Sequence, residues 1–128
     1  MRCLLDTHAF IWLVTEDPKL SEAAKDCILN SRTKLYLSSA SVWEMVIKCN
    51  IGKLKLPATP EHFITKQLTI NQIDELPISF KHTFRLHQLP DFHKDPFDRI
   101  LVAQAISEKM SILTIDPIIS KYNVKTVW

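Results

Sequence analysis

The chain has 128 residues, 46% of them hydrophobic and 23% charged, which fits one ordinary globular domain. Its 16 Lys and Arg residues and 14 Asp and Glu residues leave a net charge of +2, too little to hold a nucleic acid by bulk charge alone. The single glycine, Gly52, excludes glycine-rich phosphate-binding loops and dinucleotide-binding fingerprints. The three cysteines have the spacing of neither a disulfide framework nor a CxxC metal site, which predicts reduced, buried thiols.

No segment is predicted to cross a membrane or to direct secretion. The longest apolar run, from Ala9 to Val14, is far shorter than the roughly 20 residues that a bilayer-spanning helix needs. An acid, Asp6, stands near the N-terminus before any long apolar stretch, unlike in a secretion signal. We therefore expect a cytoplasmic protein.

The hydrophobic spacing predicts strands that alternate with helices along the whole chain. Strands are predicted over residues 2–5, 34–37, 73–76 and 111–115. Helices are predicted over residues 7–14, 20–31, 40–50, from 60 onward, 79–87 and 95–109, with Gly52 capping the third. Because a parallel crossover usually contains a helix, this order predicts an α/β sandwich with a parallel sheet, in a single domain over residues 1–128.

Four acids occupy positions that such a sheet could bring together. Asp6 and Asp116 each end a predicted strand, and ligands of open parallel sheets bind outside the carboxyl ends of the strands. Asp98 lies near a helix start, and Glu44 lies about 160° from the apolar stripe of its helix. Each acid alone has a simpler explanation, because turns, helix starts and solvated helix faces all favour acids.

The combination of acids predicts a divalent cation. Carboxylates within about 4 Å of each other repel by roughly 4 kcal/mol per pair at an effective dielectric constant near 20, so a cluster is costly without a cation. Ligation by oxygen alone selects Mg²⁺ or Mn²⁺. The chemistry that these ions serve is phosphoryl transfer, in which they activate water and neutralise charge on a phosphodiester.

The residues around the acids carry a family resemblance. They are Leu4-Leu5-Asp6-Thr7-His8, Ser38 to Glu44, Asp95-Pro96-Phe97-Asp98-Arg99, which is the most specific, and Leu113-Thr114-Ile115-Asp116. With them the sequence resembles, from end to end, the PIN-domain ribonucleases and among these the VapC-type toxins of bacterial toxin-antitoxin pairs. The resemblance implies a single PIN-like domain with about five parallel strands. It also implies a Mg²⁺-dependent endoribonuclease that forms a homodimer and is neutralised by a cognate antitoxin.

The same resemblance assigns roles to the acids. Asp6 and Asp98 would be the principal ligands of Mg²⁺ or Mn²⁺, and Glu44 and Asp116 would complete the catalytic pocket. Whether Asp95 or Asp116 shares the metal stays open. A water held by the metal and by an acid such as Glu44 would attack phosphorus, leaving 5′-phosphate and 3′-hydroxyl ends.

Several side chains near the acids are candidates for holding RNA. Arg99 is the strongest, because its planar fork suits a phosphate, and Lys48 and Thr7 are weaker. Other candidates are the basic residues Lys53, Lys55 and Lys94, the hydroxyl residues Ser39 and Thr114, and the aromatic residues Trp12 and Trp43. Solvated surface charges, turns and a place in the core or a subunit interface explain the same residues.

Two other functions stay open. A non-catalytic PIN-like module would use its carboxylates only to bind a partner, although the four intact acids argue against this. An aspartate-based phosphatase would need a second Asp two residues after Asp6, where this chain has His8. The five histidines lack metal-ligand spacing, and most are expected at the surface.

Overall fold

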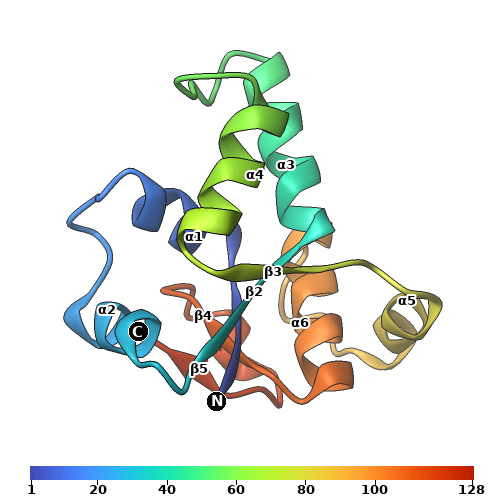
Figure 1. Ribbon diagram of the computed structural model, residues 1–128. Helices are drawn as coiled ribbons and strands as arrows, with labels where there is room; N and C mark the ends of the chain where they lie inside the picture. Colours follow the sequence, from blue (N-terminus) through green and yellow to red (C-terminus); the bar gives the residue numbers. More distant parts are fainter.

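The first strand, β1 (Arg2–Leu5), buries three consecutive residues, as a strand covered on both faces does. The computed structural model describes all 128 residues and places β1 in the middle of a five-stranded sheet (Figure 1). The strand order is β3-β2-β1-β4-β5, and every neighbouring pair is parallel. The predicted α/β fold with about five parallel strands is therefore confirmed.

The other elements follow the predicted alternation closely. The remaining strands are β2 (Lys34–Ser38), β3 (Ile73–Leu76), β4 (Ser111–Leu113) and β5 (Thr126–Val127). The helices are α1 (Thr7–Val14), α2 (Glu22–Leu29), α3 (Ser39–Asn50), α4 (Pro60–Ile70), α5 (Phe80–Arg85) and α6 (Pro96–Glu108), with short 3₁₀ helices η1 (Leu86–Gln88) and η2 (Ile119–Lys121). The last predicted strand ends two residues early, at Leu113, and β5 was not located from the sequence because two residues show no periodicity.

Side-chain caps explain where the helices begin. Ser21, Thr59 and Asp95 accept hydrogen bonds from backbone N–H groups in the first turns of α2, α4 and α6. Gly52 has φ of +75° just after α3, a conformation that glycine adopts without strain. These local signals are readable in the sequence, and the predicted helix starts agree with the structure to within two residues.

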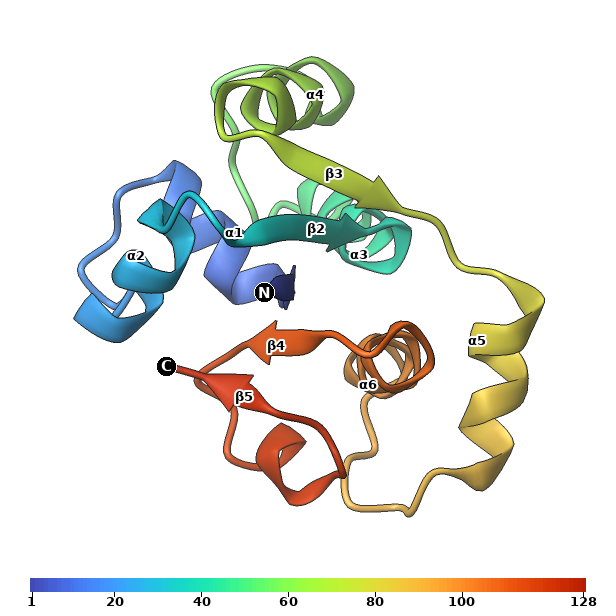
Figure 2. The same ribbon diagram turned by 60° about the horizontal axis from the view of Figure 1, so that its bottom comes forward.

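The two faces of β1 bury different helices. Cys3 and Leu5 pack in a cluster with Phe10 of α1, whereas Leu4 packs in a second cluster with Leu101 of α6. Figure 2 shows α1 and α2 on one side of the strands and α6 on the other. No helix is long and apolar enough to span a membrane. The three cysteines are free thiols, of which only Cys3 is fully buried, so the prediction of buried thiols is wrong for the other two.

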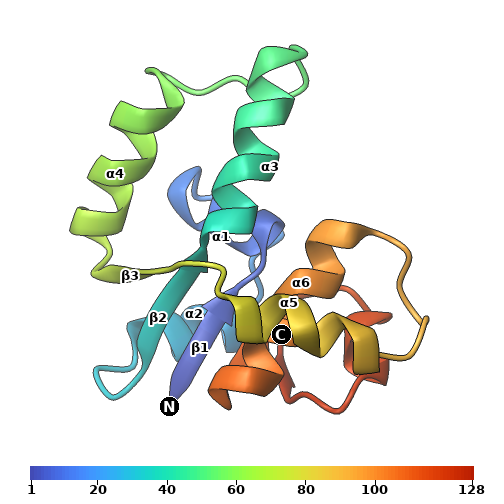
Figure 3. The same cartoon turned by 90° about the vertical axis from the view of Figure 1, so that its right-hand side faces the viewer.

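The strand order reverses direction next to β1. The chain moves outward from β1 to β2 and β3, and then returns to the other side of β1 as β4. The carboxyl ends of β1 and β4 are joined there by a hydrogen bond from the Asp6 N–H to the Leu113 carbonyl, at 3.1 Å. Helices α3 and α4 extend beyond this end of the sheet (Figure 3). Parallel α/β sheets bind ligands at such a reversal, so the topology directs attention to the residues that follow β1 and β4.

Candidate metal centre

Asp6 follows β1 directly and is buried, with 5% of its surface exposed. Its Oδ1 accepts a hydrogen bond of 2.7 Å from the Ala9 N–H, so this residue is also the N-cap of α1. Burial raises the pKa of Asp6, and the negative charge of Asp116 raises it further, against hydrogen bonds from Thr114 and Ala9 that lower it. The helix-cap explanation is correct for one oxygen, yet the carboxylate as a whole is buried near a second negative charge.

Glu44 lies on α3, on the side that also carries the buried Ala40 and Ser41, and its side chain is 13% exposed. Its Oε1 accepts a hydrogen bond of 2.8 Å from the Thr7 hydroxyl, and its Oε2 pairs with Lys48 Nζ at 2.9 Å. The buried Thr7 hydroxyl also lies 3.0 Å from the hydroxyl of Ser41, a contact the sequence did not indicate. Thr7 and Lys48, two predicted RNA contacts, are thus positioned to hold Glu44 in place.

Asp95 and Asp98 both lie at the start of α6. Asp95 is its N-cap, with Oδ1 accepting the Phe97 N–H at 2.8 Å, and Asp98 follows in the first turn. Burial raises the pKa of Asp98 from 3.8 to about 7, and the negative charges of Asp95, Glu44 and Asp116 add to the rise while His93 opposes it. Asp98 therefore interacts with acids from α3, α6 and the end of β4.

Asp116 brings the end of β4 into this cluster. Its Oδ1 accepts the Ile118 N–H at 2.8 Å, and its Oδ2 lies 2.8 Å from Nε2 of His93. The same Nε2 lies 3.2 Å from Oδ2 of Asp98. One potential ligand atom each of His93, Asp98 and Asp116 thus falls within a span of 4.8 Å. Asp6 is not part of this trio. It interacts with Asp116, whose negative charge raises the pKa of Asp6.

Three of the five histidines, His8, His62 and His87, are exposed, which agrees with the expectation that most lie at the surface, whereas His93 and His82 are not exposed. The side chain of His93 is 13% exposed and contacts two acids, and His82 is buried, with 2% of its surface exposed. A signal for His93 existed, because it is the nearest histidine in sequence to Asp98. Metal-ligand spacing could not reveal it, because its partners come from α6 and from the end of β4.

Arg99 has a different environment from the one expected of a phosphate ligand. Its Nη1 donates to the carbonyl oxygens of Pro90 and His93, at 3.0 and 3.3 Å, and to the Tyr122 hydroxyl at 3.4 Å. It also pairs with Asp91 at 3.3 Å, and its side chain is only 17% exposed. Arg99 therefore anchors the segment that precedes α6.

Replacement of Arg99 by Met is expected to lower the free energy of unfolding by about 2 kcal/mol, because it leaves carbonyl groups without a charged donor. Urea unfolding measures the loss, and Lys94→Met, which removes an exposed charge of the same segment, is the matched control with an expected change below about 0.5 kcal/mol. Weaker RNA binding by Arg99→Met at unchanged stability would instead support the phosphate role predicted from the sequence.

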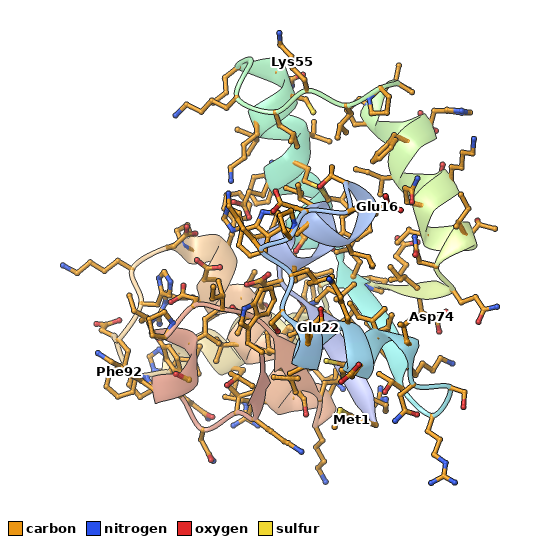
Figure 4. All side chains as sticks on the ribbon, turned by 90° about the vertical axis from the view of Figure 1, so that its left-hand side faces the viewer. Met1, Glu16, Glu22, Lys55, Asp74 and Phe92 are labelled. Carbon is orange, nitrogen blue, oxygen red and sulfur yellow. The ribbon has the colours of Figure 1, made fainter.

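The other basic candidates lie outside the cluster. Lys53, Lys55 and Lys94 are exposed. Lys55 lies at the far tip of the loop that joins α3 to α4, beyond the end of the sheet (Figure 4). Ser39 accepts the Ile78 N–H at 3.3 Å, and Thr114 accepts the Asp116 N–H at 3.0 Å, so both hydroxyls support local backbone. Thr114 also contacts the Asp6 side chain, since its hydrogen bond lowers the pKa of that acid.

The tryptophans differ in burial. Trp12 is half-buried and packs against Trp128, with ring centroids 5.6 Å apart. Trp43 is 60% exposed and packs edge-on against Phe97, at 5.1 Å. A place in the core therefore fits Trp12 and not Trp43.

The donor set of the cluster fits a divalent cation. Asp6, Glu44, Asp98 and Asp116 supply carboxylate oxygens, the donors that Mg²⁺ and Mn²⁺ prefer. Burial, together with the negative charges of Asp95, Glu44 and Asp116, raises the pKa of Asp98, so its ionised form is disfavoured in the protein without a cation. A bound cation would favour the ionised carboxylates.

Solved structures with the same fold come from three bacterial species. The chain superposes on VapBC2 of Rickettsia felis bound to a promoter DNA fragment with a TM-score of 0.75, at 16% identity, covering 98% of this chain and 97% of that one. For VapBC-1 of nontypeable Haemophilus influenzae the TM-score is 0.65, the identity 17% and the coverage 98% and 96%. For FitAcB of Neisseria gonorrhoeae the TM-score is 0.64 and the identity 18%, and the match covers 97% of this chain and 95% of that one. At such identities the likeness shows a shared fold.

The sequence itself identifies the family. A search of curated proteins gives no match. The family model of the PIN domain, in contrast, matches residues 3–125, nearly the whole chain. The chain therefore belongs to the PIN domain family.

Proposed function

We propose that this protein is a divalent-metal-dependent endoribonuclease of the VapC type. The observation that carries the proposal is the acidic cluster at the strand-order reversal, where Asp98 has a pKa of about 7 because it is buried and faces Asp95, Glu44 and Asp116. Membership of the PIN domain family and the fold shared with VapBC structures support it. The choice of RNA as substrate follows the sequence resemblance.

The proposed roles of the acids follow from their contacts. Asp6 and Asp98 would hold Mg²⁺ or Mn²⁺, with Asp116 beside them. When bound, the cation would supply activation of water and neutralise charge on the scissile phosphate. Asp98 carries a proton in a large fraction of metal-free molecules near neutral pH, so it must release this proton before it can serve as an ionised ligand.

Glu44 is the proposed holder of the attacking water. The Thr7 hydroxyl fixes one of its oxygens and the Lys48 ammonium the other, so the carboxylate has one defined orientation. Each carboxylate oxygen has two lone pairs, so both oxygens can accept another hydrogen bond from water. Glu44 can thus orient a water without a histidine as base.

The proposed partners are a cognate antitoxin and a second copy of the chain, as the resemblance implies. Helix α5 exposes Phe80 and Phe84, at 80% and 70%, with ring centroids 6.1 Å apart. Helix α3 exposes Trp43 at 60%. Large apolar residues that gather on a surface are typical of interaction sites, which supports contacts with other chains. The cytoplasm is the proposed location.

Digestion of total cellular RNA, followed by mapping of the fragment ends, tests this function. We expect fragments with 5′-phosphate and 3′-hydroxyl ends, no cleavage in EDTA, and no cleavage by Asp6→Asn. The control Asp26→Asn changes an exposed acid of α2 and should cleave like the wild type. Cleavage that survives both EDTA and Asp6→Asn would contradict the proposal, and intact RNA with the wild type and Mn²⁺ would favour a non-catalytic binding module.

A further inference from the structure

His93 lies where two acids from different elements meet. Its Nε2 is 2.8 Å from Oδ2 of Asp116 and 3.2 Å from Oδ2 of Asp98. Its other ring nitrogen, Nδ1, accepts the backbone N–H of Asp95 at 3.2 Å. The ring therefore has a polar partner on each side, and one of its nitrogens serves both carboxylates.

These partners determine the tautomer of the ring. A neutral imidazole has one nitrogen that donates and one that accepts. Because Nδ1 accepts the Asp95 N–H, the proton is on Nε2, which donates toward the two carboxylates. A histidine that binds metal through Nε2 needs a lone pair there and usually donates its other N–H to an acceptor. His93 has the opposite arrangement, so its geometry fits a hydrogen-bond donor and not a metal ligand.

The backbone of His93 is also held by buried groups. Its N–H donates to the Tyr122 hydroxyl at 2.8 Å, and its carbonyl accepts from Arg99 at 3.3 Å. Tyr122 is 4% exposed. The backbone contacts fix the position of His93, and the ring contacts fix the orientation of its imidazole. Both are expected of a residue that positions other groups of a site.

We propose that His93 is a positioning residue of the metal centre, which holds the carboxylates of Asp116 and Asp98 through its Nε2–H. Asp116 is then fixed through both oxygens, by Ile118 and by His93. Asp98 is contacted through Oδ2, so its Oδ1 would be available to ligate a cation. This inference rests on the proposed function, because it gives His93 a task only in a site that binds metal.

The first test is the ring tautomer in the metal-free protein, read from the nitrogen chemical shifts of ¹⁵N-labelled histidine. At a pH where the ring is neutral, we expect the Nε2–H form for His93. The assignment uses His93→Gln, in which only this signal should disappear. The Nδ1–H form would overturn the proposal, whether or not the protein cleaves RNA.

The second test compares Mn²⁺ affinities by calorimetry. Outer-sphere partners typically change metal affinity by about 10- to 100-fold, and we expect a loss of this size in His93→Leu, which has no donor. His93→Gln keeps an N–H donor at a similar distance from the backbone and should recover most of the affinity. His87→Leu changes an exposed histidine and should bind Mn²⁺ like the wild type. Circular dichroism checks that each variant is folded.

Electron spin echo spectroscopy of the Mn²⁺-loaded wild type completes the comparison. We expect no coupling of the metal to a histidine nitrogen, and a coupling that disappears in His93→Leu would show that His93 is a ligand and overturn the proposal. Wild-type Mn²⁺ affinity in His93→Leu, or a wild type that binds no Mn²⁺, would overturn it as well. If the Mn²⁺-loaded wild type binds metal as expected but leaves RNA intact, only the proposed nuclease function fails.

Discussion

Replacement of Asp98 by Asn is expected to abolish metal-dependent RNA cleavage and, in the absence of metal, to stabilise the fold at pH 8. The activity should fall by at least about 100-fold, which corresponds to about 2.7 kcal/mol of transition-state stabilisation, because a proposed metal ligand is lost. A variant that is more stable and less active would separate the function of this carboxylate from any structural role.

The sign of the stability change follows from the pKa of Asp98. Its pKa in the folded protein is about 7, above its ordinary value of 3.8, so between these values the folded chain binds a proton that the unfolded chain lacks. The free energy of unfolding of the wild type therefore falls as the pH rises through this range, and Asn removes that loss. Since solvent reaches 24% of the side chain, we expect a gain of about 1 to 2 kcal/mol at pH 8 and little gain at pH 4.

Urea unfolding in EDTA at the two pH values measures this effect. Asp26→Asn is the matched control, because it removes an exposed acid far from the cluster and should change stability by less than about 0.5 kcal/mol at either pH. Destabilisation of Asp98→Asn at pH 8, or wild-type cleavage by this variant, would contradict the assignment.

The second large effect is stabilisation of the wild type by Mn²⁺ or Mg²⁺. A cation that binds only the folded chain adds about 2.7 kcal/mol at a concentration 100 times its dissociation constant. At one fixed metal concentration the gain should be larger at pH 8 than at pH 6, because at the lower pH the cation competes with the proton on Asp98.

Thermal unfolding with and without the cation measures this gain at both pH values. The gain should be much reduced in Asp6→Asn and in Asp98→Asn, and complete in Asp26→Asn. Equal gains at the two pH values in all variants would instead indicate binding outside the cluster.

Much of the fold could be predicted because its signals are local. Three consecutive apolar residues mark the buried strand β1, and side chains such as Thr59 and Asp95 mark helix starts. The rule for parallel sheets then placed Asp6 and Asp116 at the same edge. The two-residue strand β5 could not be found, because it is defined only by its hydrogen bonds to β4.

The surroundings of the acids depend on contacts between distant residues, which periodicity does not reveal. The backbone of His93 is fixed by Tyr122, 29 residues away, and its ring meets Asp116, 23 residues away. Arg99 was expected to face a phosphate, and the structure directs it to the carbonyl of Pro90. The sequence shows which residues can bind a metal or donate a hydrogen bond. The path of the backbone before α6 determines which partners His93 and Arg99 contact.

Asp6 both caps a helix and lies near a second carboxylate. One of its oxygens caps α1, while burial and the charge of Asp116 raise the pKa of the same carboxyl. Asp95 likewise has two effects: it caps α6, and its negative charge raises the pKa of Asp98. A capping contact alone therefore does not exclude an acid from a metal site.

Anomalous diffraction from a crystal of the protein grown with Mn²⁺ tests the central claim most directly, because it locates the metal independently of activity. The account predicts an anomalous peak within coordination distance of carboxylate oxygens of Asp6 and Asp98, with Asp116 beside it. A fully occupied Mn²⁺ peak elsewhere on the protein, with none at these acids, would contradict it.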